Sequence, residues 1–124
     1  MLTISLMNAK GGVAKSTSSL CLASYFAQKK QRVLFIDLDP QANATKTLLE
    51  IELGRFAAAP TLYDVLYSFI MESRKNTVAE AIKPVYENLD LLPASPRMEP
   101  FKDLVKANSR RPLDVLKFIL QPIK

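Results

Sequence analysis

Several residue types on which catalytic and metal sites depend are missing or scarce in this chain of 124 residues. It contains no histidine, one cysteine and three glycines. Because the chain has no histidine, a histidine-based catalytic triad is excluded. Because it also has only one cysteine, an ordinary zinc site is excluded as well. Cys21 alone cannot build a disulfide framework, which favours a reducing, cytoplasmic setting. We expect Cys21 itself to be a small buried helix residue without a redox role.

Long hydrophobic runs are lacking as well. The apolar stretches, such as residues 33–36, fall far short of the roughly 20 residues that a membrane-spanning helix needs. Residues 18–27 are apolar, but residues 1–7 before them are also apolar and carry no basic side chain, which is the wrong order for a secretory signal. We therefore expect no membrane partner.

Acidic residues are absent from the first 36 positions. That segment carries five basic groups, whereas residues 37–96 carry five basic and nine acidic groups, and residues 97–124 carry seven basic and three acidic groups. A basic first third suggests an anionic ligand near the N-terminus. The alternative is that Lys29, Lys30 and Arg32 form a solvated helix end, where cations also suit the helix dipole. For the last segment, nucleic-acid binding and a solvated helical face both remain open.

The composition, with 48% hydrophobic and 23% charged residues, is typical of one globular domain, and the first 37 residues have the pattern of a βαβ unit. Residues 2–7 are apolar and rich in β-forming residues, which predicts a buried strand. Gly11 and Gly12 mark a turn. Residues 16–29 have the apolar spacing of a helix, and residues 32–37 predict a strand that is covered on both faces. Such a unit has parallel strands and a right-handed crossover.

Weaker signals for further elements follow along the chain. Thr61 can cap a helix whose apolar positions recur at helical spacing, and the apolar run before Pro93 indicates a strand. The apolar positions expected on the buried face of this helix are Leu62, Val65, Leu66, Phe69 and Ile70. The remaining expected elements are a short helix at 43–50, a loop at 56–60, a helix at 61–73, a helical turn at 77–82 that ends before Pro84, a third strand at 89–93, and helices at 100–106 and 113–120.

Residues 8–17, with the sequence NAKGGVAKST, have the composition of a phosphate-binding loop. Paired glycines let successive backbone N–H groups turn inward, and the following helix N-terminus adds unpaired N–H groups and a positive dipole end. Lys15 can supply a charge to the outer phosphates, and the hydroxyl of Ser16 can ligate Mg²⁺. Ala9 and Ala14 stand at the two glycine positions of the generic pattern G-x-x-x-x-G-K-S/T. If Ala14 needs a positive φ, its Cβ costs about 1–2 kcal/mol, and if it is helical the alanine is harmless.

Residues 10–17 resemble the deviant Walker A motif, K-G-G-x-x-K-S/T, of the ParA/MinD superfamily of P-loop ATPases. Residues 32–41, followed by 43–45, are similar to the next strand of that family and its D-x-D-P-Q switch. A weaker match covers residues 61–66 and 88–94. The Asp-Pro-Gln ending resembles ParA/Soj-type partition proteins. The resemblance implies a three-layer α/β P-loop NTPase fold with a mostly parallel sheet.

The resemblance also implies roles for individual residues. The nucleotide-binding residues are Lys10, Gly11, Gly12, Val13, Ala14, Lys15, Ser16 and Thr17. Lys15 would bind the β- and γ-phosphates of ATP, while Ser16 and Asp37 would lie in the Mg²⁺ shell. Asp39 would orient the attacking water, and Lys10 would reach the partner's nucleotide across a sandwich dimer, so that Lys10, Lys15 and Asp39 are the expected catalytic residues. Taken alone, the residues also allow an ordinary loop lysine at position 10, a solvated lysine at position 15, and aspartates that merely end a strand and begin a turn.

The function that the resemblance implies is that of a bacterial or archaeal partition ATPase, cytoplasmic and nucleoid-associated, acting on a plasmid or chromosome. It would form a homodimer on binding ATP, bind DNA non-specifically and work with a ParB-like centromere-binding protein. Family members are longer, and their Walker B strand, adenine pocket and main DNA surface follow the matched part. We therefore expect residues 1–124 to be one N-terminal P-loop domain with an incomplete sheet. The alternatives are a truncated, non-catalytic nucleotide-binding or interaction fragment, and an ATPase of another branch of the superfamily.

Overall fold

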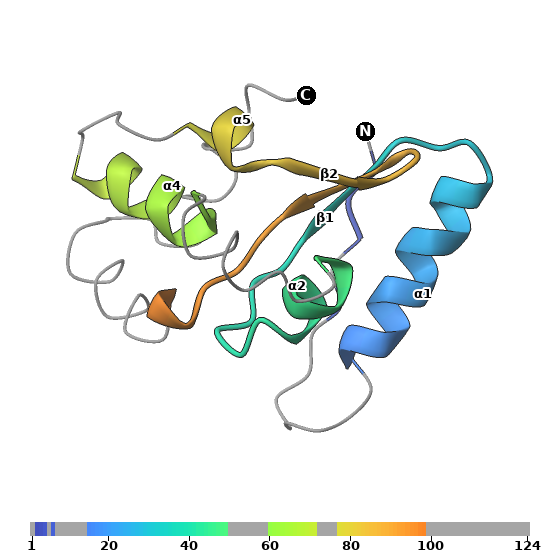
Figure 1. Ribbon diagram of the computed structural model, residues 1–124, viewed down its shortest axis with the longest axis horizontal. Coiled ribbons are helices and arrows are strands. Elements are labelled where there is room, and N and C mark those ends of the chain that lie inside the picture. Colours follow the sequence, from blue (N-terminus) through green and yellow to red (C-terminus); the bar gives the residue numbers. More distant parts are fainter. Residues whose placement is uncertain (1, 5, 7–14, 50–59, 72–76, 99–124) are drawn as a thin grey trace.

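The structure is a computed structural model that describes residues 2–4, 6, 15–49, 60–71 and 77–98. Its elements are α1 (Lys15–Gln28), β1 (Val33–Ile36), α2 (Asn43–Leu48), α4 (Leu62–Ile70), α5 (Val78–Ala81), β2 (Lys83–Tyr86), β3 (Leu89–Leu92) and the 3₁₀ helix η1 (Pro96–Met98). The sheet lies between α1 and α2 on one face and α4 and α5 on the other (Figure 1). This layering of helices on both faces of a sheet confirms the predicted α/β class.

The described sheet has three strands in the order β1-β3-β2. β1 runs parallel to β3, with Val33 opposite Leu89 and Ile36 opposite Leu92. β2 and β3 form an antiparallel pair, and Asn88 between them adopts a left-handed φ of 63°, which asparagine tolerates. The parallel pairing of β1 with β3 agrees with the predicted sheet.

β2 lies directly after the predicted helical turn at 77–82, in residues to which the sequence pattern assigns no element. The helical turn exists as α5, but the chain goes directly from it into a strand that contains Pro84. Proline is tolerated here because β2 lies at the edge of the described sheet, where its missing N–H costs no ladder hydrogen bond. A proline that favours a helix end is therefore equally compatible with an edge strand.

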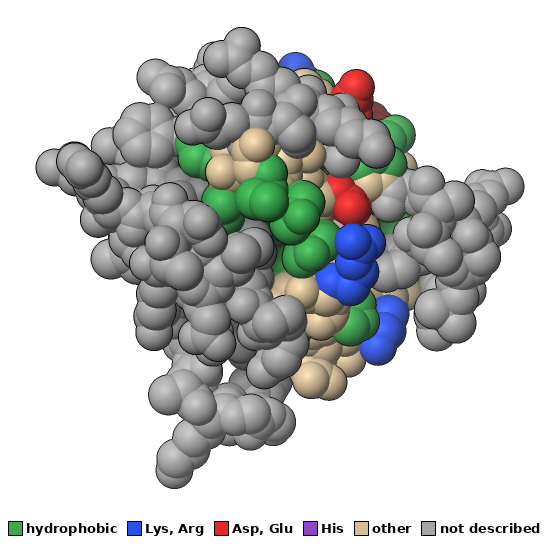
Figure 2. Space-filling view, turned by 90° about the vertical axis from the view of Figure 1, so that its left-hand side faces the viewer, with side chains coloured by type: hydrophobic (Ala, Val, Ile, Leu, Met, Phe, Trp, Pro, Cys, Tyr) green, Lys and Arg blue, Asp and Glu red, His purple; other side chains and the backbone are tan. Residues whose placement is uncertain are grey.

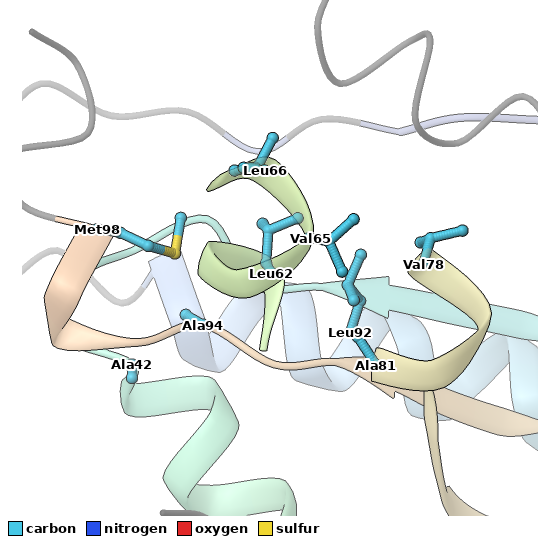
Figure 3. Close-up of a cluster of buried hydrophobic side chains, with 9 residues drawn as sticks. All are labelled: Ala42, Leu62, Val65, Leu66, Val78, Ala81, Leu92, Ala94 and Met98. Atoms are coloured by element: carbon cyan, nitrogen blue, oxygen red, sulfur yellow. The ribbon is translucent and has the colours of Figure 1, made fainter. Parts of the chain in front are cut away.

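Apolar side chains pack against both faces of the sheet. On β1, Leu34 and Ile36 pack toward α4 and α5, whereas Val33 and Phe35 pack toward α1 and α2. The buried members of the first cluster are Ala42, Leu62, Val65, Leu66, Val78, Ala81, Leu92, Ala94 and Met98 (Figure 3). The buried members of the second cluster are Ala23, Ala27, Leu48, Leu89 and Leu91. The continuous apolar run of β1 is thus explained by cover on two faces, as predicted.

The predicted strand at residues 2–7 is not formed by those of its residues that the structure describes. These residues, 2–4 and 6, belong to no strand, and Leu2, Ile4 and Leu6 are exposed. The run of β-forming residues is not sufficient to predict a strand, because such residues make a strand only where a neighbouring strand and a covering layer are available. The phosphate loop at 8–14, most of the loop at 56–60 and the helices expected at 100–106 and 113–120 lie outside the described residues.

α1 has an apolar side toward the sheet and a solvated C-terminal end. Lys29, Lys30 and Arg32 are exposed, and the ammonium of Lys30 lies 3.3 Å from the carboxylate of Glu87 at the surface. The interpretation of these three cations as a solvated helix end is therefore confirmed. The expectation that Cys21 is buried is wrong, because the side chain is exposed. Helix α1 packs through Ala23 and Ala27, and residue 21 lies about 200° around the helix from residue 23.

α4 begins after Thr61, the N-cap that the sequence predicts, and Asp64 completes a capping box that was not predicted. The backbone N–H and the hydroxyl of Thr61 donate to Asp64 Oδ2 at 2.8 and 3.0 Å. The N–H of Leu62 donates to the carbonyl of Pro93 at 2.8 Å, which ties the helix to the chain leaving β3. The start of α4 is thus joined to the carboxyl end of the sheet.

The outer side of α4 also carries apolar side chains. Tyr67, Phe69 and Met71 are exposed, although Phe69 is expected on the buried face. Figure 2 views the side of the molecule on which α4 lies and shows apolar side chains beside basic and acidic ones. Tyr63 stacks on Tyr67 with 5.9 Å between ring centroids, and the guanidinium of Arg97 lies 4.3 Å from the Tyr63 ring. The contact of Arg97 with Tyr63 joins η1 to α4.

Replacing Asp64 by alanine is expected to lower the free energy of unfolding by about 1–2 kcal/mol. The substitution removes the acceptor for Thr61 and the carboxylate that lies 3.6 Å from Arg97. Urea denaturation measures the effect. The control is Glu80→Ala, which removes the acceptor of the capping box of the four-residue helix α5 at an exposed position and should cost less. An Asp64→Ala variant as stable as the parent would contradict the role of the capping box.

Candidate functional site

The carboxyl ends of β1 and β3 lie next to each other at one edge of the sheet. The N–H of Asp37, just after β1, donates to the carbonyl of Leu92, the last residue of β3, at 3.2 Å. In open α/β sheets, ligands bind outside the carboxyl ends of the strands. This edge is therefore the candidate functional site of the described part of the chain.

Asp37 is the buried carboxylate of this edge, with 5% of its surface exposed. Its Oδ2 accepts from the N–H of Thr45 at 2.9 Å and from the Thr45 hydroxyl at 2.7 Å. Its Oδ1 accepts from the N–H of Asp39 at 3.1 Å. A buried carboxylate is costly unless hydrogen bonds compensate it, and these three bonds hold it in one orientation. The same bonds connect the end of β1 to the turn and to α2, as expected for a residue that ends a strand and begins a turn.

Asp39 lies on the turn that connects β1 to α2. Its Oδ1 accepts from the N–H of Gln41 at 3.0 Å, and its carbonyl accepts from the N–H of Ala42 at 2.8 Å. Ala42 has a left-handed φ of 55° and is fully buried in the cluster beneath α4. A non-glycine residue in that region costs on the order of 1 kcal/mol, and such strain is often found at functional sites. Asp39 itself is only half-buried, so its second oxygen can face a ligand.

The helix that follows the phosphate-loop motif begins at Lys15, as predicted to within one residue. Its first turn contains no acidic residue, so no side chain of that turn offsets the positive end of the helix dipole. Thr17 in this turn is exposed. Lys15 and Ser16 open the helix, and the other expected nucleotide-binding residues, namely Lys10, Gly11, Gly12, Val13 and Ala14, lie outside the described residues. Both alternatives for the backbone of Ala14, a positive φ and a helical one, therefore stay open.

Thr45 is a site residue to which sequence reasoning assigned no role. It is fully buried, donates twice to Asp37, and its hydroxyl oxygen accepts from the N–H of Ala94 at 3.0 Å. The available signal was its place just after the D-x-D-P-Q segment. Ala94 lies 49 positions further along the sequence, so the spacing of residues in the sequence could not reveal this contact.

Two other features are absent from the described segments. Within them, no group of three or more cysteine, aspartate or glutamate side chains could hold a metal ion by itself. Among the same residues, no helix is long and apolar enough to cross a membrane. Any divalent cation at the sheet edge would thus take most of its ligands from elsewhere, as Mg²⁺ does when it binds with substrate phosphates.

A family model and proteins of related sequence both match this chain. The family model described as AAA domain (AAA_31) matches residues 1–124. The chain is 37% identical over 91 residues to the chromosome partitioning protein ParA of Caulobacter vibrioides, an alignment that covers 73% of this chain and 31% of that protein. The chain thus spans about a third of the length of this curated relative.

Solved structures give the same picture for the fold. A plasmid partition protein from Borrelia burgdorferi superimposes with a TM-score of 0.73 at 28% identity, covering 95% of this chain and 49% of that one. McdA from Cyanothece, solved as a complex with ATP, superimposes with a TM-score of 0.74 at 28% identity, covering 94% of this chain and 41% of that one. These relatives confirm the P-loop fold that the sequence predicts.

Proposed function

Because this chain belongs to the AAA domain family and its relatives include chromosome and plasmid partition proteins, we propose that it binds ATP with Mg²⁺ at the carboxyl edge of the sheet. The observation that carries the proposal is the pairing of a buried, hydrogen-bonded Asp37 at this edge with a helix that begins at Lys15 directly after a phosphate-loop motif. The McdA complex with ATP supports the same ligand. The chain spans less than half of that structure, so ATP binding by this chain is our proposal.

In the proposed site, the phosphates lie against the loop and the start of α1. The backbone N–H groups of residues 11–14 surround the outer phosphates, and Lys15 neutralises their charge. In a homodimer, Lys10 contacts the nucleotide that is bound to the second protomer. Thr17 lies nearest the α-phosphate, and its exposure in the first turn of α1 leaves it accessible to a ligand.

The residues at the sheet edge fit a Mg²⁺ ion. A carboxylate has about four acceptor positions, and three protein hydrogen bonds reach Asp37, so acceptor capacity remains for a cation or its water. Carboxylate and hydroxyl oxygens are the ligands that Mg²⁺ prefers, and we assign Asp37 and Ser16 to its shell. When bound, Mg²⁺ would help neutralise the phosphate charge. The protein's own contribution is to hold these oxygens in place.

We assign to Asp39 the orientation of the water that attacks the γ-phosphate. Phosphoryl transfer depends on positioning and charge neutralisation more than on covalent chemistry, so a correctly placed carboxylate suffices. The turn hydrogen bonds of Asp39 with Gln41 and Ala42 would keep its carboxylate in place between β1 and α2. Lys10, supplied by a second protomer, would make hydrolysis depend on dimerisation.

If the chain hydrolyses ATP, Asp39→Ala should keep the nucleotide affinity within about twofold of the parent's and should lower the rate of ATP turnover at least about a hundredfold. Phosphate release and nucleotide binding are measured on the same samples. Glu87→Ala is the control, because it removes an exposed carboxylate whose ion pair with Lys30 is remote from the site along the chain. Undiminished turnover in Asp39→Ala would remove this residue from the mechanism.

At the level of the cell, we propose a role in plasmid or chromosome partition with non-specific DNA and a ParB-like centromere-binding protein as partners. The partition function named for the Caulobacter and Borrelia relatives supports this proposal. The second candidate is a non-catalytic nucleotide-binding or interaction fragment. The alignment covers 31% of the Caulobacter protein, so the catalytic activity of that whole protein is only a proposal for this chain.

The direct test is a titration of the 124-residue chain with a fluorescent ATP analogue, in the presence and absence of Mg²⁺. Saturable binding that Mg²⁺ strengthens is the expected result. Circular dichroism on the same sample checks that the chain is folded. A folded chain that binds no analogue would contradict ATP binding and favour the interaction fragment.

A further inference from the structure

Thr45 connects three segments of the chain at the sheet edge. It lies in α2, donates through both its N–H and its hydroxyl to Asp37 after β1, and accepts from the N–H of Ala94 after β3. All three residues are buried, Thr45 and Ala94 completely. The single hydroxyl therefore bonds both to the carboxylate and to the backbone of the β3–η1 connection.

The chemistry of the hydroxyl suits this place. A threonine side chain has one donor and two acceptor positions, and here the proton goes to the carboxylate while an oxygen lone pair receives a backbone N–H. The bond to Asp37 is short, at 2.7 Å, as expected for a hydroxyl that donates to a charged acceptor. Valine, which has nearly the same shape, would leave one carboxylate bond unmade and the N–H of Ala94 without its partner.

We propose that Thr45 is a positioning residue, whose hydroxyl holds the Asp37 carboxylate in the orientation in which it meets the Mg²⁺ of a bound nucleotide. This inference rests on the proposed function. It adds a residue outside the phosphate loop and the two aspartates, and it explains why α2 is packed against the sheet edge by a buried polar side chain.

A matched set of substitutions in the 124-residue chain tests the inference. Thr45→Val removes the hydroxyl, and Thr45→Ser keeps it while removing only a methyl group. Thr47→Val is the control, because the Thr47 hydroxyl is exposed on the same helix and donates only to the carbonyl of Asn43, at 3.0 Å. Each variant is checked for a cooperative unfolding transition.

The first readout needs no ligand and follows two NMR signals, the ¹³C resonance of the Asp37 carboxyl and the amide proton of Ala94. Thr45→Val should shift both signals, Thr47→Val should shift neither, and Thr45→Ser should keep both close to the parent. An Asp37 resonance that does not move in Thr45→Val overturns the inference.

The second readout is the Mg²⁺ dependence of binding to the fluorescent ATP analogue. Thr45→Val should raise the Mg²⁺ concentration for half-maximal binding about tenfold and leave Mg²⁺-free binding unchanged, with Thr45→Ser close to the parent. In an Asp37→Asn background, Thr45→Val should have no further effect, because the two residues act as a unit. Equal losses with and without Mg²⁺ would show a merely structural role and overturn the inference.

The two readouts also separate this inference from the proposed function. A parent chain that binds the analogue equally well with and without Mg²⁺ overturns the metal site and with it this role of Thr45. A folded parent chain that binds no analogue contradicts the proposed function, and the two resonances then decide alone whether Thr45 positions Asp37.

Discussion

Replacing Lys15 by alanine is expected to weaken binding of the ATP analogue at least about a hundredfold, to the point where titration shows no saturation. Lys15 is the first residue of α1, and the first turn of that helix contains no acidic side chain. A lysine there opposes the helix dipole and is favourable only beside an anion. Without the ammonium group, the outer phosphates lose their main protein cation.

The control for this prediction is Lys29→Ala. It removes the same charge just beyond the other end of α1, where the ammonium lies over the Tyr25 ring at 5.6 Å, and it should leave affinity within about twofold. Unchanged affinity in Lys15→Ala would overturn the phosphate-loop assignment. Equal losses in both variants would instead indicate a general dependence on positive charge.

Replacing Leu92 by alanine is expected to lower the free energy of unfolding by about 3 kcal/mol. Leu92 is fully buried in β3 and lies against Val65 of α4 and Ala81 of α5 (Figure 3). Truncation removes its apolar contacts and leaves a cavity that the surrounding helices fill only in part. Since domains are stable by about 5–15 kcal/mol, this loss is a large fraction of the total.

Urea denaturation of the parent and of Leu92→Ala measures this effect. Leu38→Ala is the matched control, because the same truncation is made at a side chain that is 53% exposed, and it should change stability by less than about 0.5 kcal/mol. Similar midpoints for Leu92→Ala and Leu38→Ala would contradict the packing of α4 and α5 on this face of the sheet.

Elements with a strong local signal were predicted well from the sequence. The helix at 16–29 was found as Lys15–Gln28, and the strand at 32–37 as Val33–Ile36. Both have uninterrupted periodic or apolar patterns. The predicted N-cap at Thr61 is also local, because its capping box joins residues only three positions apart. Such features are set by neighbours along the chain.

Elements that depend on distant partners were predicted less well. The strand expected at 2–7 is not formed by its described residues, and β2 was missed because Pro84 suggested a helix end rather than an edge strand. Cys21 and Phe69 are both exposed, because the periodic pattern marks an apolar side but not how much of it a partner layer covers.

For the site, the sequence by itself determined the motif of residues 10–17 and the two aspartates at 37 and 39, because residue type and spacing specify the chemistry of a phosphate loop. Only the tertiary structure decided that Asp37 is buried and that Thr45 joins it to Ala94. The physical reason is that parallel pairing of β1 with β3 brings together the carboxyl ends of strands that are more than 50 positions apart. A hydrogen bond across that distance leaves no periodic trace in the sequence.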